Sequence, residues 1–393
     1  ALLDSVASGD INLAEMSLQK KLSILILASY LQRVDYVTMA DSGAWEEGAG
    51  IRTSSVASVT SFLERVQEGL RAQSTNENEK QFFNSIFDQT KLTSEARNFL
   101  RTFAKSMDIE GPEDIVTTME NSFEHLDGTL DRAYLLFKKR LRRGKLGLVE
   151  VEGLDGVGRV DDAALLHTLL YAPARWNVGQ RAYLAGRLES SLGRASGVIR
   201  YKNDGFLWEL GIAYSDKLSQ VALESPDQIA VLSEDKRGYR ASTREDRDRA
   251  YQAHKSGITD RVEGKDLSEA AAIVGENLEA QWAFQDDMLV QIYSQLYIET
   301  GRVEYFDKAW RHLVRGLGQI SGSNQFTIEG HPMASFRAVE AWVPVRVMVD
   351  GQVKTVYFAS PNSPLNWAVA EKARGIVMFM KALKLREQNP VRR

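Results

Sequence analysis

Apolar residues recur every three to four positions through most of the chain, which is the spacing of an amphipathic helix. The segments with this spacing are residues 12–31, 54–70, 94–106, 129–143, 162–170, 178–192, 206–221, 267–300, 303–317 and 365–385. The pattern therefore predicts a protein that consists mainly of helices.

Strand-type alternation is clear in one place, residues 343–358. Two alternating runs there flank Asp350 and Gly351, a pair that favours a type I′ hairpin turn. We expect a small β-hairpin that decorates a helical body.

Two polar stretches interrupt the helical pattern. One opens at residues 73–78, and the other, residues 233–260, is dense in charge and poor in apolar side chains. The second is predicted to be a charged surface excursion, either an active-site lid or a disordered surface loop. Neither stretch marks a domain boundary, so we expect one domain over residues 1–393.

The composition narrows the possible partners. With 393 residues and 44% hydrophobic content the chain can bury a sizeable core, and a net charge of −4 gives no electrostatic signature of nucleic-acid binding. The apolar run at residues 22–31 is too short to span a bilayer, and Asp4 and Asp10 argue against a signal peptide. We expect a soluble protein without a membrane span; its compartment stays open, with the cytoplasm slightly favoured.

Metal and thiol chemistry find no support in the sequence. The chain has no cysteine, and its five histidines show no short metal-ligand spacing. We therefore expect no metal and no cofactor.

A basic run, KKRLRRGK, begins at Lys138 and ends at Lys145. It is either the solvated end of a helix or a site for a protein partner or an anionic surface. The sequence alone leaves both interpretations open.

The stretch MADSGAWEEGAGIRTSS places Trp45 directly before Glu46 and Glu47, among small residues that do not favour a regular helix. Glycoside hydrolysis needs one protonated carboxyl and a second that activates water. A tryptophan beside a carboxyl can stack on a sugar and raise the pKa of the acid by desolvation. Either glutamate could be the acid, although both could instead cap or pair at a junction between loop and helix.

Two further segments carry suitable side chains. Glu340 lies close to Trp342 just before the predicted hairpin, and is either a second catalytic carboxylate or an ordinary loop glutamate. Arg200, Tyr201 and Asp204 offer a donor, a stacking ring and an acceptor, the mixture that hydroxyl-rich ligands need, although a charged turn would contain the same residues.

The order of these segments resembles that of glucoamylase-type inverting glycosidases (glycoside hydrolase family fifteen) and of the related domain in phosphorylase kinase regulatory subunits. The similar segments are DSGAWEEGAGIRTSSVASV, VIRYKNDGF, EAQWAF, VEAWVPV and SPNSPLNWAVAEKARGI. The resemblance implies an (α/α)6-toroid-like helical barrel.

The resemblance also implies roles for the candidate residues. Glu46 would be the general acid and Glu340 the general base, with roughly 6.5 to 9.5 Å between their carboxyls. Arg200 and Asp204 would hold sugar hydroxyls in the first subsite, Trp45 would stack on the sugar or shape that subsite, and Glu47 would support the acid electrostatically. Tyr201 and Trp342 are further candidates for binding the oligosaccharide or polysaccharide substrate.

The chain departs from the family at its start. Only 44 residues precede Trp45, so the family's usual N-terminal helices are expected to be missing or supplied by another chain. An incomplete subsite would not position a substrate for catalysis. The alternative is therefore a catalytically silent carbohydrate-binding or regulatory scaffold.

Overall fold

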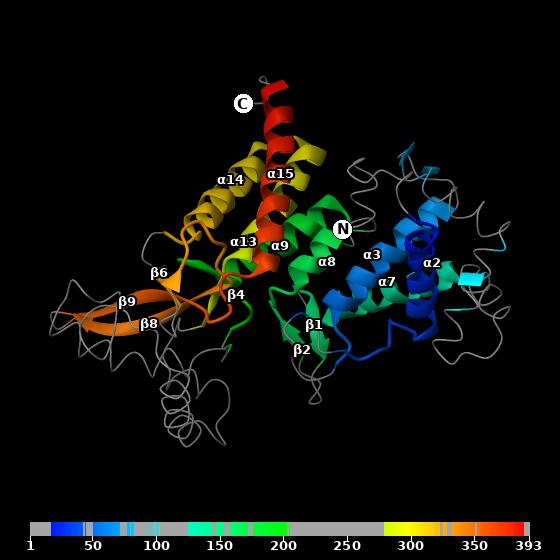
Figure 1. The fold of residues 1–393 in the computed structure, drawn as a ribbon, viewed down its shortest axis with the longest axis horizontal. Helices are drawn as coiled ribbons and strands as arrows, with labels where there is room; N and C mark the ends of the chain where they lie inside the picture. Colours follow the sequence, from blue (N-terminus) through cyan, green and yellow to red (C-terminus); the bar gives the residue numbers. More distant parts are fainter. Residues whose placement is uncertain are drawn as a thin grey trace, which may run out of the picture. The chain divides into compact units, whose positions relative to one another are not determined.

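The structure of the protein is a computed structural model (Figure 1). It describes residues 17–41, 44, 50–70, 77, 78, 80, 81, 94, 98, 99, 102, 125–143, 147–152, 158–171, 176–202, 204, 279–322, 325–327, 332–349 and 352–388. The predicted helix at 206–221 and the charged excursion at 233–260 lie outside these residues, as does most of the predicted helix at 94–106.

The chain divides into two compact units. The first unit comprises Ala1–Val160 and Tyr171–Asn177, and the second comprises Asp161–Leu170 and Val178–Arg393. Each is described by itself below, and the expectation of a single domain stays a prediction.

The first unit contains helices α2 (Leu18–Arg33), α3 (Thr53–Leu70) and α7 (Leu126–Arg143), with the antiparallel strands β1 (Val149–Glu152) and β2 (Gly158–Val160). Helix α3 packs against both other helices and against β1. Its apolar positions recur at helical spacing, and Val56, Leu63 and Val66 are buried.

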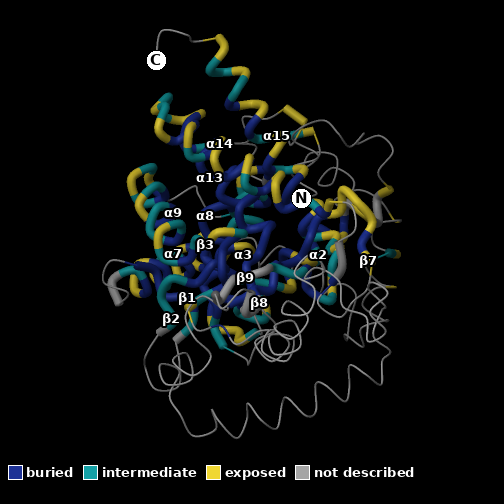
Figure 2. The backbone as a smooth tube through the Cα atoms, turned by 90° about the vertical axis from the view of Figure 1, so that its left-hand side faces the viewer, coloured by how far each residue is buried: buried dark blue, intermediate teal, exposed yellow. Residues whose placement is uncertain are grey.

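The helices of the second unit are α8 (Leu165–Tyr171), α9 (Val178–Leu192), α13 (Phe284–Thr300), α14 (Val303–Gly318) and α15 (Asn366–Gln388). Helix α13 packs against α9, α14 and α15, and its tube in Figure 2 is dark blue over most of its length. Because residues 284–294 of α13 are all buried, the polar residues among them need partners inside the protein.

The strands of the second unit form a five-stranded sheet and a separate antiparallel pair, β6 (Gln325–Phe326) with β7 (Pro332–Met333). The order of the sheet is β3 (Gly193–Arg194), β4 (Gly197–Ile199), β5 (Gln281–Trp282), β8 (Ala341–Val349) and β9 (Gln352–Ala359), and every neighbouring pair is antiparallel.

Helix predominates over strand among the described residues, which confirms the broad prediction of a mainly helical protein. The predicted hairpin is confirmed as β8 and β9, which pair from Trp342 opposite Ala359 to Val349 opposite Gln352. The hairpin is more than a decoration, however, because β8 also pairs with β5. No described helix is both long and apolar enough to cross a membrane.

Candidate functional site

The central strands bring together residues that are far apart in the sequence. Val198 of β4 lies opposite Trp282 of β5, and Gln281 of β5 lies opposite Trp342 of β8. Arg200 follows β4 directly and Glu340 precedes β8 directly. The described candidate residues therefore lie in or near β4 and β8, the two strands that pair with β5.

Arg200 and Asp204 form a buried bidentate ion pair. Arg200 Nε donates to Asp204 Oδ2 at 2.6 Å and Nη2 donates to Oδ1 at 2.5 Å. The guanidinium also lies over the Trp282 ring at 5.4 Å and the Tyr201 ring at 5.6 Å from the ring centroids. Two parallel hydrogen bonds and two aromatic faces fix this cation more firmly than a single contact would.

Glu340 is buried and held by the loop that follows β9. Ser360 Oγ donates to Glu340 Oε2 at 2.6 Å and Asn362 Nδ2 donates to Oε1 at 3.4 Å, while the Glu340 backbone N–H donates to Ser363 Oγ at 3.0 Å. An exposed loop glutamate would lack this support. The carboxylate is thus fixed in position with hydrogen-bond donors on both oxygens.

Trp342 lies in a small hydrophobic cluster with Met333, Val339 and Ala359, against which Tyr357 packs. The indole side chain is 6% exposed. Core packing accounts for this residue, and its predicted contact with a ligand stays a prediction.

Trp45, Glu46 and Glu47 lie outside the described residues. The residues on either side of them are described: Asp41 and Gly50 exchange two backbone hydrogen bonds of 2.9 Å, and Ser55 Oγ donates to Asp41 Oδ1 at 3.1 Å. Asp41 and Gly50 therefore lie close together, and the Asp41 side chain is held by the first turn of α3.

A buried cluster that the sequence did not indicate lies at the start of α3. Glu150 accepts hydrogen bonds from the Ser54 backbone N–H at 3.0 Å and from Ser54 Oγ at 2.5 Å, so it satisfies a donor that the helix itself leaves unpaired. Arg140 donates to Thr53 Oγ1 at 2.6 Å and to the carbonyls of Glu150 and Ile51.

This cluster corrects the interpretation of the basic run. Arg140 belongs to that run, yet it is buried and held by three acceptors, so it is part of the core and not of a partner surface. Lys138 and Lys139 are exposed, and the side chains from Arg142 to Lys145 lie outside the described part of the chain. Among the described side chains of the run, Lys138 and Lys139 are the basic ones exposed to a partner.

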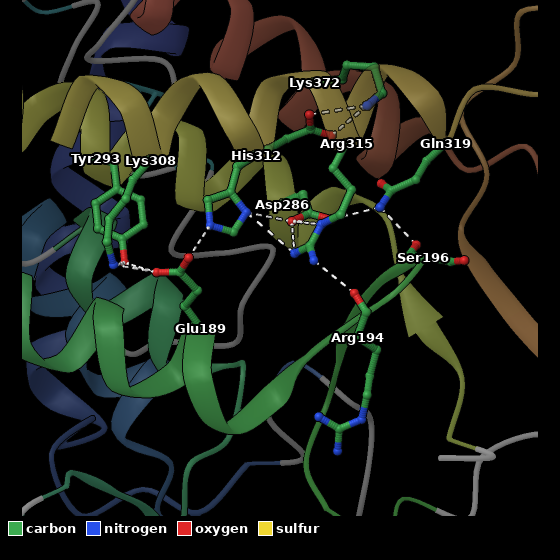
Figure 3. Close-up of polar contacts among 11 residues, drawn as sticks. Glu189, Arg194, Ser196, Asp286, Tyr293, Lys308, His312, Arg315, Gln319 and Lys372 are labelled. Atoms are coloured by element: carbon green, nitrogen blue, oxygen red, sulfur yellow. Dashed lines mark hydrogen bonds and ion pairs between the residues drawn. The ribbon is translucent and has the colours of Figure 1, made fainter. Parts of the chain in front are cut away.

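A second cluster that the sequence did not indicate lies between α9, α13 and α14 (Figure 3). His312 Nδ1 lies 2.8 Å from Asp286 Oδ1, and its Nε2 lies 3.3 Å from Glu189 Oε1. Lys308 and the Tyr293 hydroxyl both donate to Glu189 Oε2 at 2.6 Å.

The pKa values in this cluster reflect opposing effects. Burial by itself raises the pKa of Asp286, but the hydrogen bond with His312 and the charge of Arg315 outweigh it and lower the pKa. Burial also raises the pKa of Glu189, and the nearby His312 ring together with hydrogen bonds from Lys308 and Tyr293 lowers it overall. Both carboxyls are therefore ionised at neutral pH.

The neighbouring residue Asp287 has a different environment. Burial raises the pKa of its carboxyl to about 7, against the opposing charge of Lys372, whose Nζ lies 3.0 Å from Asp287 Oδ2. Lys372 Nζ also donates to the Gly316 carbonyl at 2.7 Å, which joins α13, α14 and α15.

Within the described ranges, no group of histidine, aspartate and glutamate side chains is arranged to hold a metal ion. No protein-family model matches the chain, and a comparison with curated proteins returns no match.

Proposed function

We propose that the protein is an inverting, exo-acting glycoside hydrolase that acts on α-linked glucans or glucosides, with Glu46 as the general acid and Glu340 as the general base. The observation that carries this proposal is the fixed, buried carboxylate of Glu340 beside a sheet whose neighbouring strands lead to the Arg200–Asp204 pair.

In the proposed reaction Glu46 gives its proton to the glycosidic oxygen as the bond to the sugar breaks. Glu340 takes a proton from a water molecule that attacks the opposite face of the sugar, so the configuration at the anomeric carbon is inverted. Ser360 and Asn362 support this role because their hydrogen bonds keep the Glu340 carboxylate in one orientation.

The remaining candidates would hold the sugar. Arg200 and Asp204 would bind hydroxyl groups, and Tyr201 and Trp45 would stack on the ring. Trp342 would line the same subsite, and Glu47 would support the acid electrostatically. The paired geometry of Arg200 and Asp204 supports this role, since donors and acceptors that are already ordered lose little entropy on binding.

We further propose that the helices belong to an (α/α)6-toroid-like barrel of six helical hairpins in a single domain. The antiparallel connection from α13 to α14 through Gly301 and Arg302 supports this arrangement, because Gly301 adopts a left-handed conformation (φ 70°) that ends α13 and reverses the chain. We also propose that the protein is cytoplasmic.

A catalytically silent carbohydrate-binding or regulatory scaffold is the second candidate. It is favoured because these side chains already have hydrogen-bond partners, as structural side chains do. Arg200 and Asp204 bond to each other, and Glu340 bonds to the loop that follows β9. In this case the exposed Lys138 and Lys139 would contribute to a partner site.

The test is glucose release by the purified full chain from maltooligosaccharides, glycogen and trehalose. Glu340→Gln and Glu46→Gln should each lower turnover by about 10²- to 10⁴-fold, the usual contribution of a general acid or base. The matched control is Glu304→Gln, because Glu304 is exposed on α14 and pairs only with Arg302 among the contacts described.

If Glu340→Gln and Glu46→Gln keep the parent's turnover, the assignment of the two carboxylates is wrong. If the parent releases no sugar from any of these substrates yet binds maltooligosaccharides in calorimetry, the scaffold is the better account.

A further inference from the structure

His312 is the central residue of the cluster in Figure 3, and both of its ring nitrogens face carboxylate oxygens. A neutral imidazole has only one N–H, so its other nitrogen would direct a lone pair at a carboxylate. An imidazolium donates from both nitrogens. The geometry therefore suits the protonated ring, which joins Asp286 of α13 to Glu189 of α9.

Charged and titratable groups face His312 from each helix packed around it. Helix α13 contributes Asp286 and Tyr293, α9 contributes Glu189, and α14 itself contributes Lys308 and Arg315. Each carboxylate already has one permanent cation, Lys308 on Glu189 and Arg315 on Asp286. Among the described residues, His312 is thus the one shared partner of the two carboxylates whose charge can change near neutral pH.

The cluster also reaches the sheet. Arg315 donates to Asp286 and, through Nη1, to the Arg194 carbonyl at 2.8 Å. Gln319 Nε2 donates to Asp286 Oδ2 at 2.7 Å and to the Ser196 carbonyl at 2.8 Å. Asp286 thereby orients the two side chains that hold the β3–β4 hairpin, residues 193–199.

We propose that His312 is a proton-linked clamp, whose imidazolium joins α9, α13 and α14 and, through Asp286, holds the β3–β4 hairpin that leads directly to Arg200. Loss of the proton removes the positive charge that lies between Asp286 and Glu189, which weakens the attraction of the ring to both carboxylates and loosens the hairpin. This inference goes beyond the proposed hydrolase activity and does not depend on it.

The electrostatics agree with the geometry. Burial by itself lowers the pKa of His312, but the hydrogen bond with Asp286 and the nearby Glu189 carboxylate outweigh this effect and raise the pKa above 6.5. The contribution of the clamp to stability is therefore fully present below about pH 6.5 and is lost as the pH rises through the folded-state pKa. Each pKa unit of elevation corresponds to about a tenfold change in the folding equilibrium constant.

The direct experiment is an NMR titration of the ring nitrogens in the full chain labelled with ¹⁵N-histidine. We expect the His312 signals to be those of an imidazolium at pH 6.5 and to change only at higher pH. A neutral His312 ring at pH 6.5 would overturn the proposal. Because this measurement uses the unaltered protein, it stands even if a variant fails to fold.

A second experiment tests the clamp itself. In urea unfolding from pH 6 to pH 9, His312→Gln should lose less stability with rising pH than the parent does. His125→Gln, which changes an exposed histidine of the first unit, should follow the parent. Hydrogen exchange of residues 193–199, corrected for the intrinsic effect of pH, should accelerate above the titration in the parent. Equal pH profiles for the parent and His312→Gln would contradict the clamp.

Discussion

At the scale of single residues, two buried histidines of the second unit have opposite surroundings. His312 faces two carboxylates, whereas His167 packs on the Trp367 ring at a centroid distance of 5.6 Å. Burial lowers the pKa of His167 to about 4, and the opposing charge of Glu371 does not compensate. The effect of burying an imidazole thus depends on which groups its nitrogens meet.

The low pKa of His167 predicts a loss of stability in acid. Between pH 6.5 and about pH 4 the unfolded chain binds a proton at this residue and the folded protein does not, so stability falls as the pH falls. The full effect is on the order of 3 kcal/mol. We expect His167→Phe to lose less stability than the parent between pH 7 and pH 4, as measured by urea unfolding at each pH.

His125→Gln is the control, because the exposed His125 should leave that slope unchanged. If the free energy of unfolding of His167→Phe fell with pH as steeply as that of the parent, His167 would be charged in the folded protein.

At the scale of helices, the close approach of α13, α14 and α15 depends on two glycines. A Cβ atom at Gly375 of α15 would lie 3.1 Å from the Asp287 carbonyl oxygen, and one at Gly316 of α14 would lie 2.8 Å from Asp287 Oδ1. By contrast, a Cβ at Gly318, two residues further along α14, would meet nothing within 4 Å. Of these three glycines, Gly375 and Gly316 therefore occupy positions without room for a side chain, whereas Gly318 does not.

We expect Gly375→Ala and Gly316→Ala each to lower the free energy of unfolding by roughly 1–3 kcal/mol, the usual cost of overpacking. Gly375→Ala is the stronger test because its neighbour is backbone, which cannot rotate away. Gly318→Ala is the matched control and should be neutral or more stable by up to about 1 kcal/mol, since alanine favours a helix. Chemical denaturation measures all three. A Gly375→Ala variant as stable as Gly318→Ala would mean that the helices are further apart than the structure shows.

At the scale of the whole molecule, the proposed hydrolysis would need two carboxyls that belong to distant parts of the sequence. The stereochemistry of the first product tests both of their roles together. An inverting reaction on an α-linked maltooligosaccharide should release β-glucose, which ¹H NMR distinguishes from the α-anomer before mutarotation. The signal should fall with Glu340→Gln and persist with Glu304→Gln. Initial release of α-glucose would exclude the inverting mechanism.

Local sequence patterns were sufficient to locate several of the helices and the hairpin. The helix predicted over residues 267–300 is wrong at Gln281 and Trp282, which form β5, and the observed helix begins at Phe284. The predicted helices at 54–70, 178–192 and 303–317 match the observed ends within one residue, and alternation around Asp350 and Gly351 predicted β8 and β9. These features depend on the order of apolar and polar residues within one segment, which a single sequence displays directly. Arg200, Asp204 and Glu340 were likewise predicted as site candidates from their residue types and their neighbours in the sequence.

Which of these segments contact one another depends on the tertiary structure. Strands β3, β4 and β5 contain two or three residues each, too few for a periodic pattern, and their pairing depends on segments far along the chain. The same holds for the partners of Arg140 and for the two carboxylates that face His312. Burial and charge act between residues that folding brings together, so the pKa of His312 and the support of Glu340 by Ser360 follow from contacts that no local pattern encodes.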